Sequence, residues 1–294
     1  MIKRIGVIGL IGVLAAAFCA AQMGTPVPPA FRSDVRLVEV YATVFDQRGR
    51  PVTGLTRENF EVADNGEPQP ILSFESSDSE LSCAILLDTT GSMIPALPAV
   101  KNAVTRLIGE LGENDWIAVY GFSASLRLLQ DFTRDKSAAK RAVLGIRTGG
   151  STALFDAVAQ VALDLSRRKG KKAIIAFTDG DDNSSYLNAT VALARVRKVG
   201  VPLYTVAEGE ALRSQSLLQQ LVDISKRTGG LSYAAKKSRD VEDIFQGISR
   251  DLNHTYMLAY TAPQANNDKW RSIHLIVKGP KGYKVRAKEG YEPN

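Results

Sequence analysis

Apolar and polar residues follow two different patterns along this chain of 294 residues. Between residues 80 and 253, short apolar runs alternate with segments in which apolar residues recur every three to four positions. The runs Cys83–Leu87 and Ala173–Phe177 are apolar throughout, as expected of strands that are buried on both faces. The periodic segments predict amphipathic helices. Together they predict an α/β fold with a doubly wound, mostly parallel sheet.

The remaining elements of this region follow from the same two patterns. The further strands expected are Trp116–Phe122, Leu126–Phe132 at an edge of the sheet, Val201–Val206 and Leu231–Ala234. The helices expected cover about residues 95–111, 135–146, 153–168, 187–199, 214–227 and 240–253.

Short strands without helices between them flank this region on both sides. On the N-terminal side the strands expected are Val38–Val44, Phe60–Ala63 and Ile71–Phe74. On the C-terminal side they are Tyr256–Tyr260, Ile273–Val277 and Tyr283–Ala287. Neither set is large enough to form a core alone. We therefore expect residues 35–78 and 254–294 to pair into one small β domain, with residues 80–253 inserted between them. Two separate flaps packed on the main domain are the alternative.

The first residues have the layout of a secretory signal peptide. Two basic residues precede an apolar run over residues 5–18, and small residues follow. Cleavage after Ala21 would remove residues 1–21 and leave a Pro-rich linker over residues 22–34. An uncleaved membrane anchor is the alternative. No later stretch is apolar for long enough to span a membrane, so we expect an exported protein that is periplasmic, cell-surface or extracellular.

Charge and residue counts exclude several classes of function. The net charge of +6 falls to +4 without the predicted signal peptide, and no aromatic residues interleave with basic ones, so no nucleic-acid partner is expected. The basic cluster Arg167–Lys172 is expected to be a solvated loop. Cys83 is expected to be a small core residue. Two histidines, His254 and His274, leave little material for a zinc site or a Ser/His/Asp triad.

Three separated stretches carry side-chain oxygens that suit one divalent cation. They are Asp88-Thr89-Thr90-Gly91-Ser92, Gly149-Gly150-Ser151-Thr152 and Thr178-Asp179-Gly180. Each alone could be a helix cap or a turn. The first and third, however, follow predicted buried strands, and open parallel sheets bind ligands beyond the carboxyl ends of their strands. We therefore expect Asp88, Thr90, Ser92, Thr152 and Asp179 to converge on one ion. Mg²⁺ suits these hard oxygen donors, and Mn²⁺ or Ca²⁺ is compatible with them.

The first stretch resembles the Asp-x-Ser/Thr-x-Ser signature of von Willebrand factor type A (VWA) domains, and the resemblance covers residues 80–253. Thr152 and Asp179 match the Thr and Asp that the family's metal-ion-dependent adhesion site takes from a second and a third loop. Thr90 stands where Ser is commoner, and it keeps the hydroxyl. The flanks resemble a group of secreted bacterial "VWFA-related" proteins at Val52-Thr53-Gly54-Leu55, Asn59-Phe60, Tyr256–Tyr260 and Gly290-Tyr291.

The resemblance implies a Rossmann-like sheet and a protein-binding role rather than an enzyme, with no catalytic residues. It implies that Ser92 and Thr90 coordinate Mg²⁺ directly, that Asp88 and Asp179 act through bound water, and that Thr152 approaches when a ligand binds. The metal then takes an Asp or Glu side chain of a partner protein as its last ligand. In the family, such binding can shift the C-terminal helix, and here that helix leads into the predicted β domain.

Two other hypotheses stay open. The segment from Asp88 to Ser92 also resembles the Asp-Lys-Thr-Gly-Thr of haloacid dehalogenase enzymes, with residues 178–183 as their acidic Mg²⁺ motif. In such a phosphatase Asp88 is the nucleophile, and Lys171 or Lys172 is the candidate to hold the phosphate. Against it, Thr rather than Lys stands at position 89. In the remaining hypothesis the metal is structural and the β domain binds the partner.

Overall fold

The computed structural model describes residues 36–293, apart from residues 180–181, 238, 265–268 and 281. The predicted signal peptide and linker, residues 1–21 and 22–34, lie outside the described residues. Within the described ranges, no helix has the length and apolar character that crossing a membrane requires.

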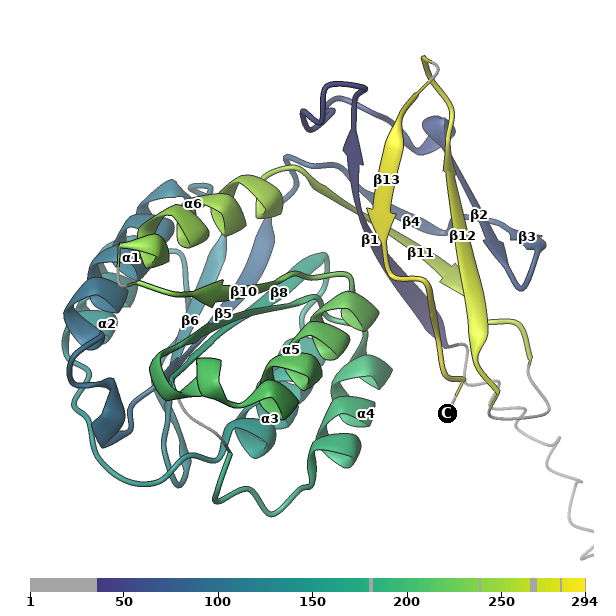
Figure 1. Ribbon diagram of the computed structural model, residues 1–294. Helices are drawn as coiled ribbons and strands as arrows, with labels where there is room; N and C mark the ends of the chain where they lie inside the picture. Colours follow the sequence, from purple (N-terminus) through teal and green to yellow (C-terminus); the bar gives the residue numbers. More distant parts are fainter. Residues whose placement is uncertain (1–35, 180–181, 238, 265–268, 281, 294) are drawn as a thin grey trace, which may run out of the picture. The chain divides into compact units, whose positions relative to one another are not determined.

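The central sheet has the strand order β10-β9-β8-β5-β6-β7 (Figure 1). All neighbouring strands in it are parallel except β7, which runs antiparallel to β6 and forms an edge, as predicted. The strands are β5 (Leu81–Asp88), β6 (Trp116–Phe122), β7 (Leu126–Thr133), β8 (Lys171–Thr178), β9 (Leu203–Glu208) and β10 (Ser232–Ala235). The sheet is therefore mixed but mostly parallel.

Helices cover both faces of this sheet (Figure 1). One face carries α1 (Leu97–Glu110), α2 (Lys136–Leu144) and α6 (Asp240–Leu252). The other carries α3 (Leu154–Ser166), α4 (Ala189–Val199) and α5 (Gln215–Thr228). Short 3₁₀ turns are η1 (Arg57–Asn59), η2 (Gly91–Met93) and η3 (Gly209–Arg213). Both faces of strand β5 are apolar. Cys83 and Ile85 pack into the core on one side of the sheet, and Ala84 and Leu86 pack into the core on the other side, so helices must bury both faces. The predicted α/β fold is confirmed.

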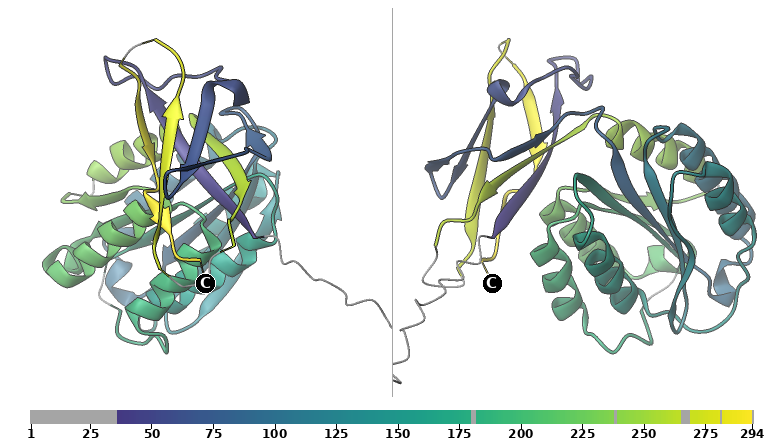
Figure 2. Two further views of the ribbon diagram at one scale, coloured as in Figure 1. Left: turned by 90° about the vertical axis from the view of Figure 1, so that its right-hand side faces the viewer. Right: turned by 180° about the vertical axis from the view of Figure 1, so that it is seen from behind.

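The N- and C-terminal strands build two antiparallel sheets, with the orders β13-β1-β11-β4 and β14-β12-β2-β3 (Figure 2). The N-terminal strands are β1 (Leu37–Phe45), β2 (Phe60–Asp64), β3 (Glu67–Gln69) and β4 (Ser73–Glu75). The C-terminal strands are β11 (Thr255–Thr261), β12 (Arg271–Val277), β13 (Lys284–Ala287) and β14 (Gly290–Tyr291). Since β1 pairs with β11 and β2 with β12, the expected pairing of the two chain ends is confirmed. The exact domain boundaries stay a prediction.

A buried carboxylate ties these two sheets together. Asp64, at the end of β2, has no exposed surface. Its carboxylate accepts hydrogen bonds at 2.8 Å from the hydroxyls of Tyr260 on β11 and Tyr291 on β14. Arg271 on β12 pairs with the same carboxylate at 2.6 Å. Because β11 belongs to one sheet and β12 and β14 to the other, Asp64 links both through a fully satisfied buried charge.

The expectation of a solvated loop over Arg167–Lys172 is wrong for its last two residues. Lys171 and Lys172 begin β8 and are only 2% and 5% exposed. The Nζ of Lys171 donates to the carbonyl oxygen of Ser77 at 2.6 Å, and the Nζ of Lys172 pairs with Glu39 on β1 at 2.6 Å. Local charge density did not reveal acceptors that come from distant segments.

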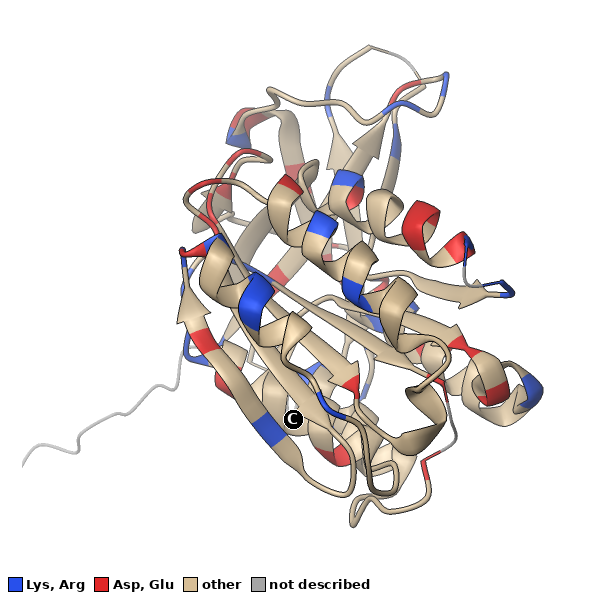
Figure 3. Cartoon of the chain, turned by 90° about the vertical axis from the view of Figure 1, so that its left-hand side faces the viewer, with Lys and Arg blue, Asp and Glu red and all other residues tan. Residues whose placement is uncertain are grey.

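Elsewhere, charges of both signs are mixed on the surface. Figure 3 shows residues of both signs on the helices that face the viewer, with Asp and Glu mainly on α6 and Lys and Arg on α1 and α2.

Candidate metal centre

The candidate site lies where the strand order of the central sheet reverses. From β5 the chain continues outward through β6 and β7, whereas β8, β9 and β10 extend from its other side. Strands β5 and β8 are parallel neighbours, with Leu87 opposite Phe177. Their carboxyl ends therefore lie side by side, and these ends carry Asp88 and, one residue beyond β8, Asp179. A crevice at such a switch point is the usual ligand site of an open α/β sheet.

Two hydrogen-bonded pairs in close contact bring together four of the five predicted ligands. The carboxylate oxygen Oδ1 of Asp88 accepts from the backbone N–H of Thr90 at 2.9 Å and from its hydroxyl at 2.7 Å. The Thr90 and Ser92 hydroxyl oxygens are 3.0 Å apart. The Ser92 hydroxyl then donates to Oδ1 of Asp179 at 3.0 Å. Two carboxylates and two hydroxyls from distant parts of the sequence thus surround one small volume.

The fifth residue, Thr152, lies on the neighbouring loop. It is 4% exposed, and its backbone N–H donates to the side-chain oxygen of Asn183 at 3.0 Å. Gly149 and Gly150 before it have φ angles of +155° and +94°, which non-glycine residues rarely adopt. The N–H of Gly149 donates to the Thr89 carbonyl at 2.7 Å, which fixes this loop against the first one. Among the described residues, no hydrogen bond joins the Thr152 side chain to the four linked ligands.

The electrostatics of this site favour a cation. The pKa of Asp179 is raised to about 6, mainly by burial and next by the negative charge of Asp88, with a smaller contribution from Glu208, while the hydrogen bond from Ser92 opposes the rise. Burial also raises the pKa of Asp88, although hydrogen bonds from Thr90 and Thr178 oppose that rise. A divalent cation at this position would stabilise the ionised forms of both carboxylates, because its positive charge offsets their mutual repulsion.

The donor atoms decide which kind of metal fits. In the part of the chain that the structure describes, no three His, Cys, Asp or Glu side chains form a metal-binding group. The candidate site instead combines two carboxylates with hydroxyl groups, and all of its donors are hard oxygens. Such donors fit Mg²⁺, Mn²⁺ or Ca²⁺ better than a metal that prefers thiolate or imidazole.

Sequence reasoning missed two kinds of supporting residue. The hydroxyl of Thr178 donates to Oδ2 of Asp88 at 3.1 Å, on the side away from Thr90. The carboxylate of Asp182 accepts from the backbone N–H of Phe155 at 2.8 Å, at the start of α3. Both contacts join segments that are distant in sequence, so no local pattern could have found them. The only sequence signal for Thr178 was its place as a polar residue at the end of a buried strand.

The geometry counts against the residue roles of the phosphatase hypothesis. Lys171 and Lys172 begin β8, whereas Asp88 lies beside the far end of that strand. Seven residue steps along a strand separate the two ends by about 23 Å, which is far beyond the reach of a lysine side chain. Both ammonium groups are already bound to Ser77 and Glu39. Neither lysine can hold a phosphate at Asp88.

Comparison with known families identifies the domain that carries these residues. The family model of the von Willebrand factor type A domain matches residues 83–247, which is more than half of the chain. The chain therefore belongs to the VWA family. No curated protein matches the sequence.

Solved structures share the fold at low sequence identity. A von Willebrand factor type A protein from Catenulispora acidiphila is 15% identical with a TM-score of 0.51, and the match covers 87% of this chain and 73% of that protein. Proximal thread matrix protein 1 from the mussel byssus, solved with a zinc-occupied MIDAS motif, is 16% identical with a TM-score of 0.52. That match covers 63% of this chain and 48% of the mussel protein. At these identities the similarity shows the fold alone.

Proposed function

We propose that this protein is a metal-dependent protein-binding module. Asp88, Thr90, Ser92, Thr152 and Asp179 hold one divalent cation, preferably Mg²⁺, with Mn²⁺ or Ca²⁺ as substitutes. The partner is a protein that presents an Asp or Glu side chain to the site. When bound, the cation supplies an electrophilic position that an anionic oxygen can occupy.

The observation that carries this proposal is the link from Asp88 to Asp179 through the hydroxyls of Thr90 and Ser92. Each carboxylate keeps an oxygen outside these contacts, and burial makes ionisation of both costly. The hydroxyl donors are neutral, so they leave much of the metal's charge uncompensated. With Asp88 and Asp179 acting through bound water, the metal would keep an electrophilic position for an acidic side chain from outside. The zinc-occupied MIDAS of the mussel protein supports a divalent cation at the equivalent place on this fold.

The first test measures metal binding by the full chain and by two variants. Calorimetric titration of the full chain with MgCl₂ and MnCl₂ is expected to give one site per molecule, which Ser92→Ala abolishes or weakens at least tenfold. Ser216→Ala removes an exposed hydroxyl at the start of α5, and this control is expected to bind metal normally. Equal metal binding by the protein and Ser92→Ala would contradict the proposed site.

The second test concerns the partner. A random peptide library displayed on phage is panned against the full chain with Mg²⁺ or with chelator. Peptides selected only with Mg²⁺ are expected to contain Asp or Glu, and Ser92→Ala is expected to select none of them. Selection that does not depend on the metal would instead support a partner site on the β strands. Phosphatase assays on aryl phosphates, with Asp88→Asn as the control, test the enzyme hypothesis directly.

We also propose that the protein is exported after removal of residues 1–21. N-terminal sequencing of protein isolated from its source is expected to begin at Gln22. A sequence that begins at Met1 would contradict cleavage.

A further inference from the structure

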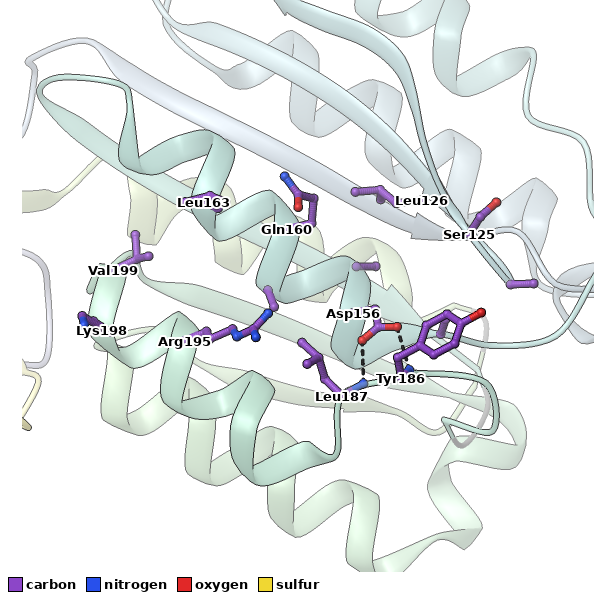
Figure 4. Close-up of a pocket in the computed structure, with 14 residues that line it drawn as sticks. Ser125, Leu126, Asp156, Gln160, Leu163, Tyr186, Leu187, Arg195, Lys198 and Val199 are labelled. Atoms are coloured by element: carbon purple, nitrogen blue, oxygen red, sulfur yellow. Dashed lines mark hydrogen bonds between the residues drawn. The ribbon is translucent and has the colours of Figure 1, made fainter. Parts of the chain in front are cut away.

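A groove of about 710 Å³ lies beside the candidate metal centre (Figure 4). Helix α3 lies between the start of β7 on one side and α4 on the other, and residues of all three line it. The groove begins at Ala153, which directly follows the predicted ligand Thr152. The N–H of Ala153 donates to the carbonyl of Ser123 at 2.9 Å, which holds this end of the groove against the turn between β6 and β7.

Much of the lining is apolar and accessible. Leu126 contributes to it and is partly exposed, and Leu163 on α3 remains 47% exposed. Tyr186 lines the groove and is 97% exposed. The one carboxylate in the lining, Asp156, is held by the backbone N–H groups of Tyr186 and Leu187 at 2.8 and 2.9 Å. This carboxylate is therefore already hydrogen-bonded within the protein, and it holds the backbone of Tyr186 in place.

The end of the groove away from Thr152 is positively charged. Arg195 and Lys198, on successive turns of α4, are both exposed and line it. Within the described residues, neither forms an ion pair, in contrast to Arg197 between them, which pairs with Glu292 at 3.4 Å. Two unpaired cations at the end of an apolar surface are complementary to an apolar segment that ends in an acidic residue.

We propose that this groove binds the partner segment that follows the acidic residue at the metal. The segment is extended, carries apolar side chains and ends in a second Asp or Glu that pairs with Arg195 and Lys198. From Ala153 to Leu163, α3 rises about 15 Å, a span that about five extended residues cover. The partner therefore contains two acidic residues about five positions apart, with apolar residues between them. This inference rests on the proposed function for its first anchor, and the second anchor is independent of the metal.

The test uses three synthetic peptides and the full chain. The parent peptide is acetyl-Asp-Leu-Ala-Leu-Ala-Glu-amide, and the other two replace its Glu by Gln or its Asp by Asn. Binding is followed by ¹H–¹⁵N NMR titration in Mg²⁺ and in chelator, which also locates the contact. The groove variant is Arg195→Ala with Lys198→Ala. The matched control, Lys236→Ala with Lys237→Ala, removes two exposed charges after β10, at the opposite edge of the sheet.

For the unmodified protein and the control variant, the Glu-to-Gln change is expected to weaken binding about threefold to tenfold, as for one or two exposed ion pairs. The groove variant is expected to bind these two peptides equally and still to need Mg²⁺. Amide shifts at Gln160 and Leu163 are expected only when the groove is filled.

The two proposals fail in different ways. If binding needs Mg²⁺ but the Glu-to-Gln change has no effect on the unmodified protein, the groove inference is overturned and the metal-dependent function stands. If binding ignores Mg²⁺ but still depends on Arg195 and Lys198, the metal-dependent function is overturned and the groove inference stands. Absence of any binding at millimolar peptide overturns both.

Discussion

At the scale of single residues, the site depends on hydroxyl groups that hold carboxylates in place. Ser92 reaches Asp179, and Thr90 reaches Asp88. The hydroxyl of Thr178 donates to the other carboxylate oxygen of Asp88, Oδ2. Each hydroxyl can donate to only one acceptor at a time, so each fixes the orientation of one carboxylate. Removing a supporting hydroxyl should therefore alter metal affinity without removing a predicted ligand.

Thr178→Val is expected to weaken metal binding about tenfold, because Asp88 loses the hydrogen bond at Oδ2 that orients it. Titration calorimetry with MnCl₂ measures the effect. The control is Thr205→Val on β9, which also removes a buried hydroxyl, one bonded to Ser232 at 2.8 Å. That variant should lose stability but keep its metal affinity. Equal metal affinity in Thr178→Val and the unmodified protein would contradict the supporting role.

Lys171 predicts a pH dependence of stability. Burial lowers the pKa of its ammonium group from 10.5 to about 8, although the charges of Asp115, Asp78 and Glu75 act in the opposite direction. Between about pH 8 and pH 10.5 the folded protein has released a proton that the unfolded chain still binds, so stability rises with pH in this window. Relative to Lys171→Met, the unfolding free energy of the unmodified protein should rise by up to about 3 kcal/mol.

Urea unfolding at pH 8, 9 and 10 checks this expectation. The comparison uses the change with pH and not the absolute stability, because Lys171→Met also loses the bond to the Ser77 carbonyl. Parallel pH profiles for the two proteins would show that Lys171 keeps its usual pKa in the folded state.

At the scale of elements, the start of α3 is capped by a distant loop. The N-cap residue is Ala153, whose side chain cannot accept a hydrogen bond. The first N–H groups are instead satisfied by Asp182, which accepts from Phe155, and by Ser185, which accepts from Asp156 at 3.1 Å. The loop after β8 thus fixes the helix that follows Thr152. The same loop also holds Thr152, whose backbone N–H donates to the side-chain oxygen of Asn183.

Asp182→Ala is expected to lower the unfolding free energy by about 1 kcal/mol through loss of this cap. It should also weaken the Mg²⁺-dependent binding of acidic peptides, because Thr152 lies directly before the uncapped end. The control is Asp135→Ala, which removes a comparable cap on α2, where Asp135 accepts from Ser137 and Ala138 at 2.8 and 3.0 Å. Similar destabilisation without loss of binding is expected there. Equal binding losses in the two variants would contradict the positioning role.

At the scale of the whole molecule, one buried carboxylate connects the α/β region to the terminal strands. Asp251, in the last turn of α6, accepts from Tyr204 on β9 at 2.5 Å and from Thr43 on β1 at 3.2 Å. Arg286 on β13 forms an ion pair with it. Since Asp251 is only 8% exposed, these three groups satisfy a charge that water barely reaches.

Asp251→Ala is expected to cost about 3 kcal/mol, because it leaves the partly buried guanidinium of Arg286 without its carboxylate partner. Adding Arg286→Met should restore part of this loss by removing the unpaired charge. The control is Asp243→Ala on the same helix, where the side chain is exposed and the cost should be below about 0.5 kcal/mol. Urea unfolding measures all four proteins. No recovery in the double variant would contradict the pairing argument.

The same contacts bear on the predicted coupling between the metal site and the β strands. Helix α6 ends at Leu252 and is followed by β11. We expect Mg²⁺ together with an acidic peptide to change hydrogen exchange in α6, and Asp251→Ala to enlarge that change by releasing the end of the helix. Unchanged exchange in α6 would contradict the coupling.

The sequence by itself determined the elements and most candidate ligands of this protein. Apolar periodicity depends on which faces are buried, so it located the central strands and helices within a few residues. The positions of Asp88 and Asp179 after strands were equally local features. Tertiary structure decided what depends on contacts between distant segments. These were the pairing of β5 with β8, the support of Asp88 by Thr178, the cap from Asp182, and the burial of Lys171 and Lys172. The physical reason is that burial and hydrogen-bond partners are properties of neighbours in space, which no local pattern specifies.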